Sequence, residues 1–131
     1  MHRLTADDFG LSQIGQISVN VHDLGRAVGF YRNTLGMKFL FEAPNMAFFD
    51  CGGVRLMLAV PTDPQFDHPG SIVYYRVADI HAAFDTLSSR GARFENEPHL
   101  VARLPDHELW MAFVRDADGN LLALMSEIRP A

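Results

Sequence analysis

The stretch at residues 16–24, QISVNVHDL, decides the fold because residues 72–80, IVYYRVADI, repeat its pattern at an offset of 56. In the first copy apolar residues alternate with polar ones, which is the period of a β-strand with one buried face. Each copy then reaches an aspartate, Asp23 or Asp79, a residue type that caps helix N-termini by accepting hydrogen bonds from free backbone amides. The chain is therefore predicted to contain two copies of one strand-to-helix unit.

Helices are expected after both caps. Apolar residues recur at three- and four-residue spacing over 24–35 and again over 80–87, the pattern of a helix with one buried face. Gly36 and Gly91 follow, and glycine can end a helix in the left-handed conformation. Each half is thus predicted to be a βαβββ module. The expected extended segments are 38–42, 47–50 and 54–60 in the first half, and 93–103, 108–115 and 121–127 in the second.

Turns and a connector set the predicted boundaries. Residues 50–53, DCGG, and 116–119, DADG, precede the last strand of each half, and their offset of 66 indicates an insertion of about ten residues in the hairpin around 104–107. Residues 61–70 hold three prolines and a glycine, which would interrupt any strand pairing. One domain over residues 1–131 is predicted, with module one at about 14–60, a connector at 61–70 and module two at about 71–128.

Composition excludes several classes of protein. The chain has 131 residues, 48% hydrophobic and 21% charged, which suits one globular domain, and no apolar run approaches the roughly 18 residues of a membrane span. Eleven basic against sixteen acidic residues give a net charge of -5, the wrong sign for binding nucleic acid. A single cysteine and the absence of an apolar signal segment in residues 1–15 predict a cytoplasmic location.

The family resemblance rests on several motifs that occur in order. Two βαβββ modules, the segment FYRNTLG at 30–36 and the turn DADGN at 116–120 together resemble the vicinal-oxygen-chelate superfamily of glyoxalases, bleomycin-resistance proteins and extradiol dioxygenases. The resemblance covers roughly residues 14–128, and a ferredoxin-like duplication is the alternative. It implies an α+β fold in which two tandem modules form cupped mixed sheets around a cavity, with the helices on the outside.

The resemblance also locates four positions that hold a metal in other members. They lie on the first and last strand of each module, where metal-binding members carry His or Glu. In this sequence they are Gln16, Met57, Ile72 and Ala123. One neutral amide, one thioether and two hydrocarbon side chains cannot replace the hydration shell of a divalent cation. Neither a metal nor another cofactor is predicted, and metal-dependent glyoxalase or dioxygenase activity is not expected.

Side chains that share a strand face with these four positions should line the cup. The result is an apolar pocket with a few polar anchors, which is typical of a small-molecule site. Local hydrogen bonds for Ser18 and Asn20, and solvation for Arg55 and Arg76, are the alternatives. Trp110 suits a ligand wall, a subunit contact or core packing. The predicted ligand-binding set is Gln16, Ser18, Asn20, Arg55, Met57, Ile72, Tyr74, Arg76, Trp110, Leu121, Ala123 and Met125.

The second-half hairpin carries candidate catalytic residues. His107 and Glu108 could act as base and acid, or both could form a displaced metal site with His99. Adjacent strand residues point to opposite faces, however, and a turn at 105–106 places His99 several pairs away from His107. The same turn places Arg103 opposite Glu108, so a cross-strand ion pair is the alternative for that carboxylate.

Three functions follow from these patterns. The leading interpretation is a metal-independent small-molecule-binding or sequestering protein of the glyoxalase/bleomycin-resistance type. The second is an enzyme of altered mechanism, an isomerase, lyase or hydrolase that uses polar residues of the cavity or hairpin. The third is a structural or regulatory dimer with an empty cup. A homodimer is expected because open module edges are usually paired, whereas neither nucleic acid nor membrane is an expected partner.

Overall fold

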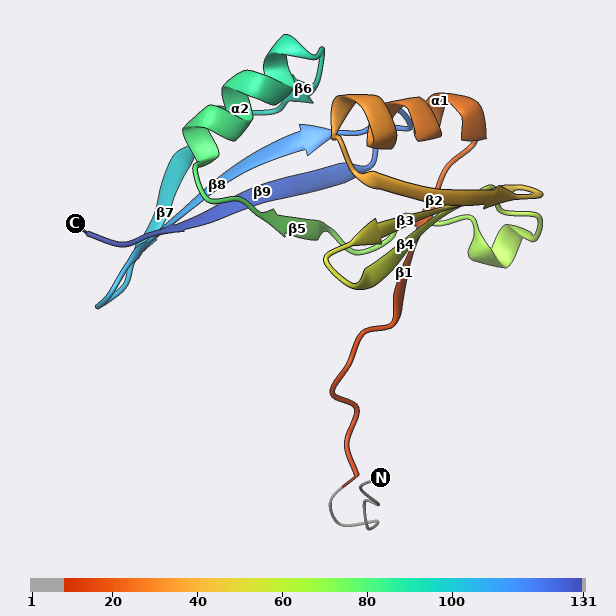
Figure 1. Cartoon of the computed structure of the whole chain (residues 1–131), viewed down its shortest axis with the longest axis horizontal. Coiled ribbons are helices and arrows are strands. Elements are labelled where there is room, and N and C mark those ends of the chain that lie inside the picture. Colours follow the sequence, from red (N-terminus) through yellow and green to blue (C-terminus); the bar gives the residue numbers. More distant parts are fainter. Residues whose placement is uncertain (1–8, 131) are drawn as a thin grey trace.

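Two β-sheets lie side by side, and both α-helices lie along the same side of the molecule (Figure 1). The structure is a computed structural model that describes residues 9–130; residues 1–8 and 131, at the ends of the predicted domain, lie outside the description. The predicted α+β fold is confirmed. Within the described residues, no helix has the length and apolar character needed to cross a membrane.

The first module forms a four-stranded sheet in the order β1-β4-β3-β2. β1 runs parallel to β4, and the other pairings are antiparallel. A π-helical turn, Phe30–Thr34, continues α1. The other elements are β1 (Gln16–Asn20), α1 (Leu24–Gly29), β2 (Lys38–Ala43), β3 (Met46–Cys51) and β4 (Val54–Ala59).

The second module repeats this order with one additional strand. Its sheet runs β5-β9-β8-β6, β5 is parallel to β9, and β7 also pairs with β8. The segment 93–103, predicted as one extended stretch, is two strands separated by residues 95–98. A short helical turn, Pro64–Phe66, lies in the connector. The other elements are β5 (Val73–Arg76), α2 (Ile80–Ser89), β6 (Arg93–Phe94), β7 (His99–Arg103), β8 (Glu108–Arg115) and β9 (Leu121–Ile128).

Both predicted helix caps are present. The Asp23 carboxylate accepts a hydrogen bond from the N–H of Arg26 at 3.1 Å, and the Asp79 carboxylate accepts one from Ala82 at 3.0 Å. The helical segments end as expected near glycines with left-handed backbone conformations. Their φ angles are 72° at Gly36 and 92° at Gly91.

The π-helical turn after α1 was not predicted. The N–H of Leu35 donates to the carbonyl of Phe30 at 2.9 Å, one residue further back than in an α-helix. This wider turn contains Tyr31, which is buried and whose hydroxyl reaches Asp116, 85 residues along the chain. The spacing of apolar residues within one helix cannot report a contact made at that distance in sequence.

One hydrophobic core serves both modules. Alternate strand residues such as Leu58 and Leu124 pack together with Ala27 of α1 and with Ile80 and Leu87 of α2. The remaining strand residues lie on faces that carry no helix, which we call the open faces. The predicted ligand residues on them are Gln16, Ser18, Asn20, Arg55 and Met57 in the first sheet, and Tyr74, Arg76, Leu121, Ala123 and Met125 in the second.

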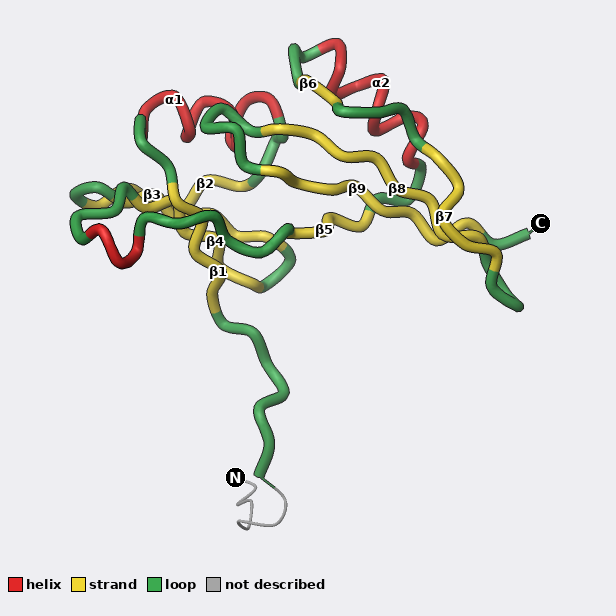
Figure 2. Tube along the Cα trace, turned by 180° about the vertical axis from the view of Figure 1, so that it is seen from behind, coloured by secondary structure: helices red, strands yellow, loops and turns green. Residues whose placement is uncertain are grey.

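The β7–β8 hairpin lies at the end of the molecule farthest from the first sheet (Figure 2). It turns through residues 104–107, where the N–H of Leu104 donates to the carbonyl of His107 at 2.8 Å. β8 and β9 are each eight residues long, whereas the corresponding strands of the first module have six. The hairpin and the C-terminal end of β9 thus extend the second open face beyond the length of the first.

Candidate functional site

Three residues of the predicted ligand set meet on the first open face. In the parallel register of β1 and β4, Ser18 is the partner of Met57, so these two side chains lie on the same face of the sheet. Gln16, two residues before Ser18, lies on that face as well. The Nε2 atom of Gln16 lies 3.8 Å from the Sδ atom of Met57. Two of the four positions that the family resemblance assigns to metal ligands therefore contact each other directly.

Two phenylalanines extend this surface and were missing from the prediction. Phe48 of β3 pairs with Met57, and its ring stacks on that of Phe41 with 4.6 Å between centroids. The guanidinium carbon of Arg55 lies 5.9 Å from the centroid of the Phe48 ring. The four positions assigned from the family resemblance lie on the first and last strands of each module, so none is in β3. Alternation of side chains along β3 would have predicted Phe48.

The second open face is also aromatic. Tyr74 and Phe113 are the ladder neighbours of Ala123 on either side, and their rings meet edge to face with 6.2 Å between centroids. Ala123 is fully buried, whereas Tyr74 is 44% exposed and Ile72, just before β5, is 40% exposed. Ala123 therefore lies on the predicted face but is covered, so a ligand would meet Tyr74 instead.

Charged side chains follow one another at the hairpin end of this face. Arg76 Nη2 lies 2.9 Å from Glu127 Oε1, and Glu127 Oε2 lies 3.2 Å from His107 Nε2. The other ring nitrogen of His107, Nδ1, lies 2.8 Å from Asp106, which also contacts Arg129 at 2.9 Å. Glu127 was not among the predicted site residues, although it shares a strand face with Ala123 and Met125 by alternation along β9.

His107 and Glu108 do not form an acid–base pair. Glu108 accepts hydrogen bonds from Trp110 Nε1 at 3.1 Å and from Arg103 Nε at 3.3 Å. These bonds, with that of Trp110 the larger effect, lower the pKa of Glu108, so its carboxylate stays ionised near neutral pH. The predicted cross-strand pair of Arg103 and Glu108 is confirmed, and the proposed pairing of Glu108 with His107 as acid and base has no support in the geometry.

Trp110 and His99 have surroundings that differ from those of a ligand wall or a metal site. Trp110 is on the helix-covered face, where its ring centroid lies 5.3 Å from that of His81 in α2, so it packs in the core and lines neither open face. His99 packs near Phe113 at 6.5 Å, whereas His107 contacts carboxylates at the hairpin. Among residues 9–130, no three His, Cys, Asp or Glu side chains are arranged to hold a metal.

Several polar residues of the predicted set already have protein partners. The Nδ2 atom of Asn20 donates to the carbonyl oxygens of Phe66 and His68 in the connector, the latter at 3.0 Å. These bonds join Asn20 to residues 46 and 48 positions further along the chain, so they are not the local hydrogen bonds considered as the alternative for Asn20. Arg76 is paired with Glu127 and yet remains 72% exposed, so it can still meet a ligand.

The four family metal positions do not fit a divalent cation. The Gln16 amide faces the Met57 thioether, and Ile72 and Ala123 offer hydrocarbon groups. Hard cations such as Mg²⁺ require several oxygen ligands, and Zn²⁺ requires thiolate, imidazole or carboxylate donors. No chemical step can be derived through a metal at these positions.

Several large apolar side chains of the open faces are exposed to solvent. Phe41 is 48% exposed, and Tyr74 has nearly the same exposure. A cavity of about 360 Å³ lies beside Arg76 and Glu127, and another of about 370 Å³ lies between the modules. None of the four family positions lines either of these two cavities.

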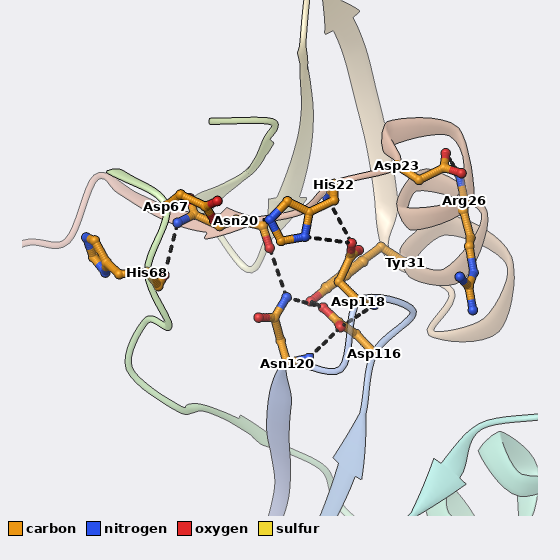
Figure 3. Close-up of polar contacts among 10 residues, drawn as sticks. All are labelled: Asn20, His22, Asp23, Arg26, Tyr31, Asp67, His68, Asp116, Asp118 and Asn120. Carbon is orange, nitrogen blue, oxygen red and sulfur yellow. Dashed lines mark hydrogen bonds and ion pairs between the residues drawn. The ribbon is translucent and has the colours of Figure 1, made fainter. Parts of the chain in front are cut away.

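A hydrogen-bonded loop, residues 116–120, fixes one module to the other (Figure 3). One oxygen of the buried Asp116 carboxylate accepts from the Tyr31 hydroxyl at 2.9 Å and from Asn120 Nδ2 at 2.8 Å, and the other accepts two backbone N–H groups of the loop. Asn120 Nδ2 also donates to the carbonyl of Asn20 at 3.0 Å. The DADGN motif thus sets the relative placement of the two open faces.

The sequence match agrees with this architecture. The model of the Glyoxalase/Bleomycin resistance protein/Dioxygenase superfamily matches residues 13–124, which span both modules and the Asp116 loop. The chain therefore belongs to this superfamily, and the resemblance drawn from the repeated modules and the DADGN turn is confirmed.

The individual relatives described next are each less than 30% identical to this chain. Uncharacterized protein YraH of Bacillus subtilis (strain 168) is 27% identical in an alignment of 126 positions, and the match covers 83% of this chain and 94% of that protein. A glyoxalase/bleomycin resistance protein/dioxygenase from Nocardioides superposes with a TM-score of 0.72 at 21% identity, covering 94% of this chain and 90% of the other. Lactoylglutathione lyase from Agrobacterium tumefaciens superposes with a TM-score of 0.69 at 20% identity, covering 89% and 95%. At these identities the two structures share the fold.

Proposed function

We propose that the protein is a metal-independent small-molecule-binding or sequestering protein whose ligand lies against the open faces. The observation that carries this proposal is the side-chain composition of those faces. Phe41, Met57 and Tyr74 provide aromatic and thioether surface, and Arg55 and Arg76 provide guanidinium groups beside it. Small-molecule sites combine apolar walls with a few polar groups that fix orientation. An apolar or aromatic ligand with an anionic substituent suits this arrangement.

A second copy of the chain is proposed to complete the cavity. Phe41, Ile72 and Tyr74 are each at least 40% exposed, and monomeric proteins seldom leave large contiguous apolar patches uncovered. β1 and β5 are edge strands of their sheets, with one side of each free for pairing. Apposed open faces would cover the apolar side chains and enclose a ligand between them.

The binding test is a thermal-shift screen of aromatic compounds followed by calorimetry on variants. Met57→Lys places a charge on the first face and should abolish measurable binding. Arg76→Ala should weaken an anionic hit by about 1.5 to 3 kcal/mol, the usual cost of losing a charged hydrogen bond. Asp85→Asn, on the exposed side of α2, serves as the control. Unchanged affinity in both test variants would place the ligand elsewhere.

Ala123→Glu is unsuitable as a test of binding because Ala123 is fully buried, and the substitution would bury an unpaired carboxylate and destabilise the fold.

Metal independence has its own test. Elemental analysis of the purified protein should find no stoichiometric divalent metal, and a chelator should leave the melting temperature unchanged, because no metal binding is linked to folding. Added nickel or zinc should not produce turnover of a hemithioacetal, the substrate class expected for a glyoxalase. One tightly held metal per chain, or robust turnover, would contradict the proposal that the protein works without a metal.

An enzyme of altered mechanism is the second candidate, and the contact of His107 with Glu127 favours it. The two residues lie at the end of the open face, and Glu127 also lines the cavity of about 360 Å³. Binding remains the preferred proposal because both ring nitrogens of His107 face carboxylates, at 2.8 and 3.2 Å, which leaves neither free to accept a ligand proton. If a screening hit is turned over, and His107→Gln removes turnover without weakening binding, the enzyme is favoured.

A further inference from the structure

The cavity of about 370 Å³ between the modules has walls from both of them. α1 and the turn after it contribute Arg26 and Phe30 to one wall, and β6 and β8 contribute Arg93 and Arg115 to the other. None of the twelve predicted ligand residues lines this cavity. It is a separate site whose two walls are held together by the Asp116 loop.

Two arginines of this cavity face each other across a pair of strands. Arg93 and Arg115 are directly opposite each other in the β6–β8 ladder, and like charges in that position destabilise a sheet. Arg26 extends away from the carboxylate of Asp23, the cap of its own helix (Figure 3). Over residues 9–130, no carboxylate lies within 4.0 Å of the guanidinium groups of Arg26 or Arg93. Their charges are therefore available to an anion.

The carboxylates of Glu95 and Asp116, near the cavity, already have hydrogen-bond partners. Glu95 binds Arg115 Nε, and both oxygens of Asp116 are occupied by hydrogen bonds from the loop and from the other module. A fourth guanidinium group, that of Arg90, donates to the carbonyl of Thr34 at 3.2 Å, and Thr34 lines the cavity. Among the side chains that line the cavity, three arginines, Arg26, Arg93 and Arg115, face one carboxylate, that of Asp116, in a chain whose net charge is -5.

We propose that this cavity binds a small phosphate monoester. Arginine binds phosphate through parallel N–H donors, and a phosphate monoester carries nearly two negative charges at neutral pH, which suits a site where the guanidinium groups of Arg26 and Arg93 have no carboxylate partner among the described residues. The volume exceeds that of a bare phosphate and lies at the lower end of small-molecule sites, so the ester carries an organic group. Phe30 also lines the cavity and would give that group an apolar surface to contact.

Calorimetric titration tests the proposal with phenyl phosphate, glycerol phosphate and adenosine monophosphate, each compared with its dephosphorylated counterpart. At least one monoester should bind saturably at one per chain, and its counterpart should not. Arg93→Gln and Arg26→Gln should each weaken binding by roughly tenfold or more, as expected for loss of a charged contact. Arg32→Gln is the matched control, because Arg32 lies over the Phe39 ring, 4.8 Å from its centroid, and does not line the cavity.

Stability measurements separate a ligand-binding arginine from a structural one. Without ligand, Arg93→Gln should melt at the same temperature as the wild type or higher, because the substitution removes the like-charge pair with Arg115. Saturable binding combined with this result supports the site. The proposal fails if no monoester saturates at millimolar concentration, if Arg32→Gln weakens binding as much as Arg93→Gln, or if Arg93→Gln lowers the melting temperature. Met57→Lys should leave monoester affinity intact, so this site and the proposed open-face site can fail independently.

Discussion

Two buried tyrosine hydroxyls differ in what surrounds them. Tyr31 donates to the Asp116 carboxylate at 2.9 Å, whereas the Tyr75 hydroxyl is buried without a hydrogen-bond partner among the described residues. Burial raises the pKa of both groups, and the charge of Asp116 raises that of Tyr31 further. A hydroxyl that loses water without gaining a partner destabilises the folded state. The two hydroxyl groups should therefore contribute to stability with opposite sign.

Matched phenylalanine substitutions test this difference. Tyr31→Phe removes a hydrogen bond to a buried charge and should lower the free energy of unfolding by about 1.5 to 3 kcal/mol. Tyr75→Phe removes an unpaired hydroxyl, so the free energy of unfolding should stay constant or rise by up to about 1 kcal/mol. Urea denaturation of the three proteins gives the comparison. Equal losses in both variants would mean that the Tyr75 hydroxyl has a partner in solution.

Contacts within one element or one hairpin were predictable from sequence. The caps at Asp23 and Asp79 depend on the next three residues, and the Arg103–Glu108 pair depends on one tight turn. The contact of His107 with Glu127 joins the hairpin to the end of β9, a register that spacing alone does not give. Spacing alone also does not give the sheet face on which Trp110 lies, so the sequence left three possible environments for its side chain.

Two carboxylates near the turn of the β7–β8 hairpin, those of Asp106 and Glu108, accept hydrogen bonds from neighbouring side chains. Hydrogen bonds from Arg129 first and then His107 lower the pKa of Asp106, and those from Trp110 and Arg103 lower that of Glu108. A carboxyl group whose folded pKa lies below its unfolded value stabilises the fold above the unfolded pKa. That contribution is lost as pH falls through the lower, folded pKa, so the hairpin should loosen in acid before the core does.

Trp110, the one tryptophan in the chain, can report this acid transition. Its indole N–H donates to Glu108, so protonation of that carboxylate below pH 4.5, the ordinary pKa, should change the tryptophan emission. Glu108→Gln should remove this emission change because glutamine does not titrate, while Glu97→Gln should retain it. Fluorescence recorded from pH 6 to about pH 2 gives the comparison. An identical transition in Glu108→Gln would assign it to another group.

The repeat predicted the strands and helices of each module, but it did not predict how the two modules meet. Their relative placement depends on Asp116 and Asn120, which contact Tyr31 and Asn20 in the first module. Within the sequence the DADGN segment looks like an ordinary hairpin turn, because its partners are about 85 to 100 residues away. The π-helical turn and the arginine-lined cavity arise from the same junction, which is why neither was expected.

The open faces lead to a prediction for the whole molecule. Light scattering should give a mass of twice 14.6 kDa at micromolar concentration, because pairing of two chains covers apolar side chains that one chain leaves exposed. Phe41→Glu should shift this mass toward that of one chain without unfolding it, since the Phe41 ring is already 48% exposed. Leu104→Glu, with 44% exposure at the far hairpin, makes the same kind of change away from the paired faces and should leave the dimer intact. A wild-type mass of 14.6 kDa throughout the micromolar range would refute the homodimer, and dissociation by both variants would move the interface away from the open faces.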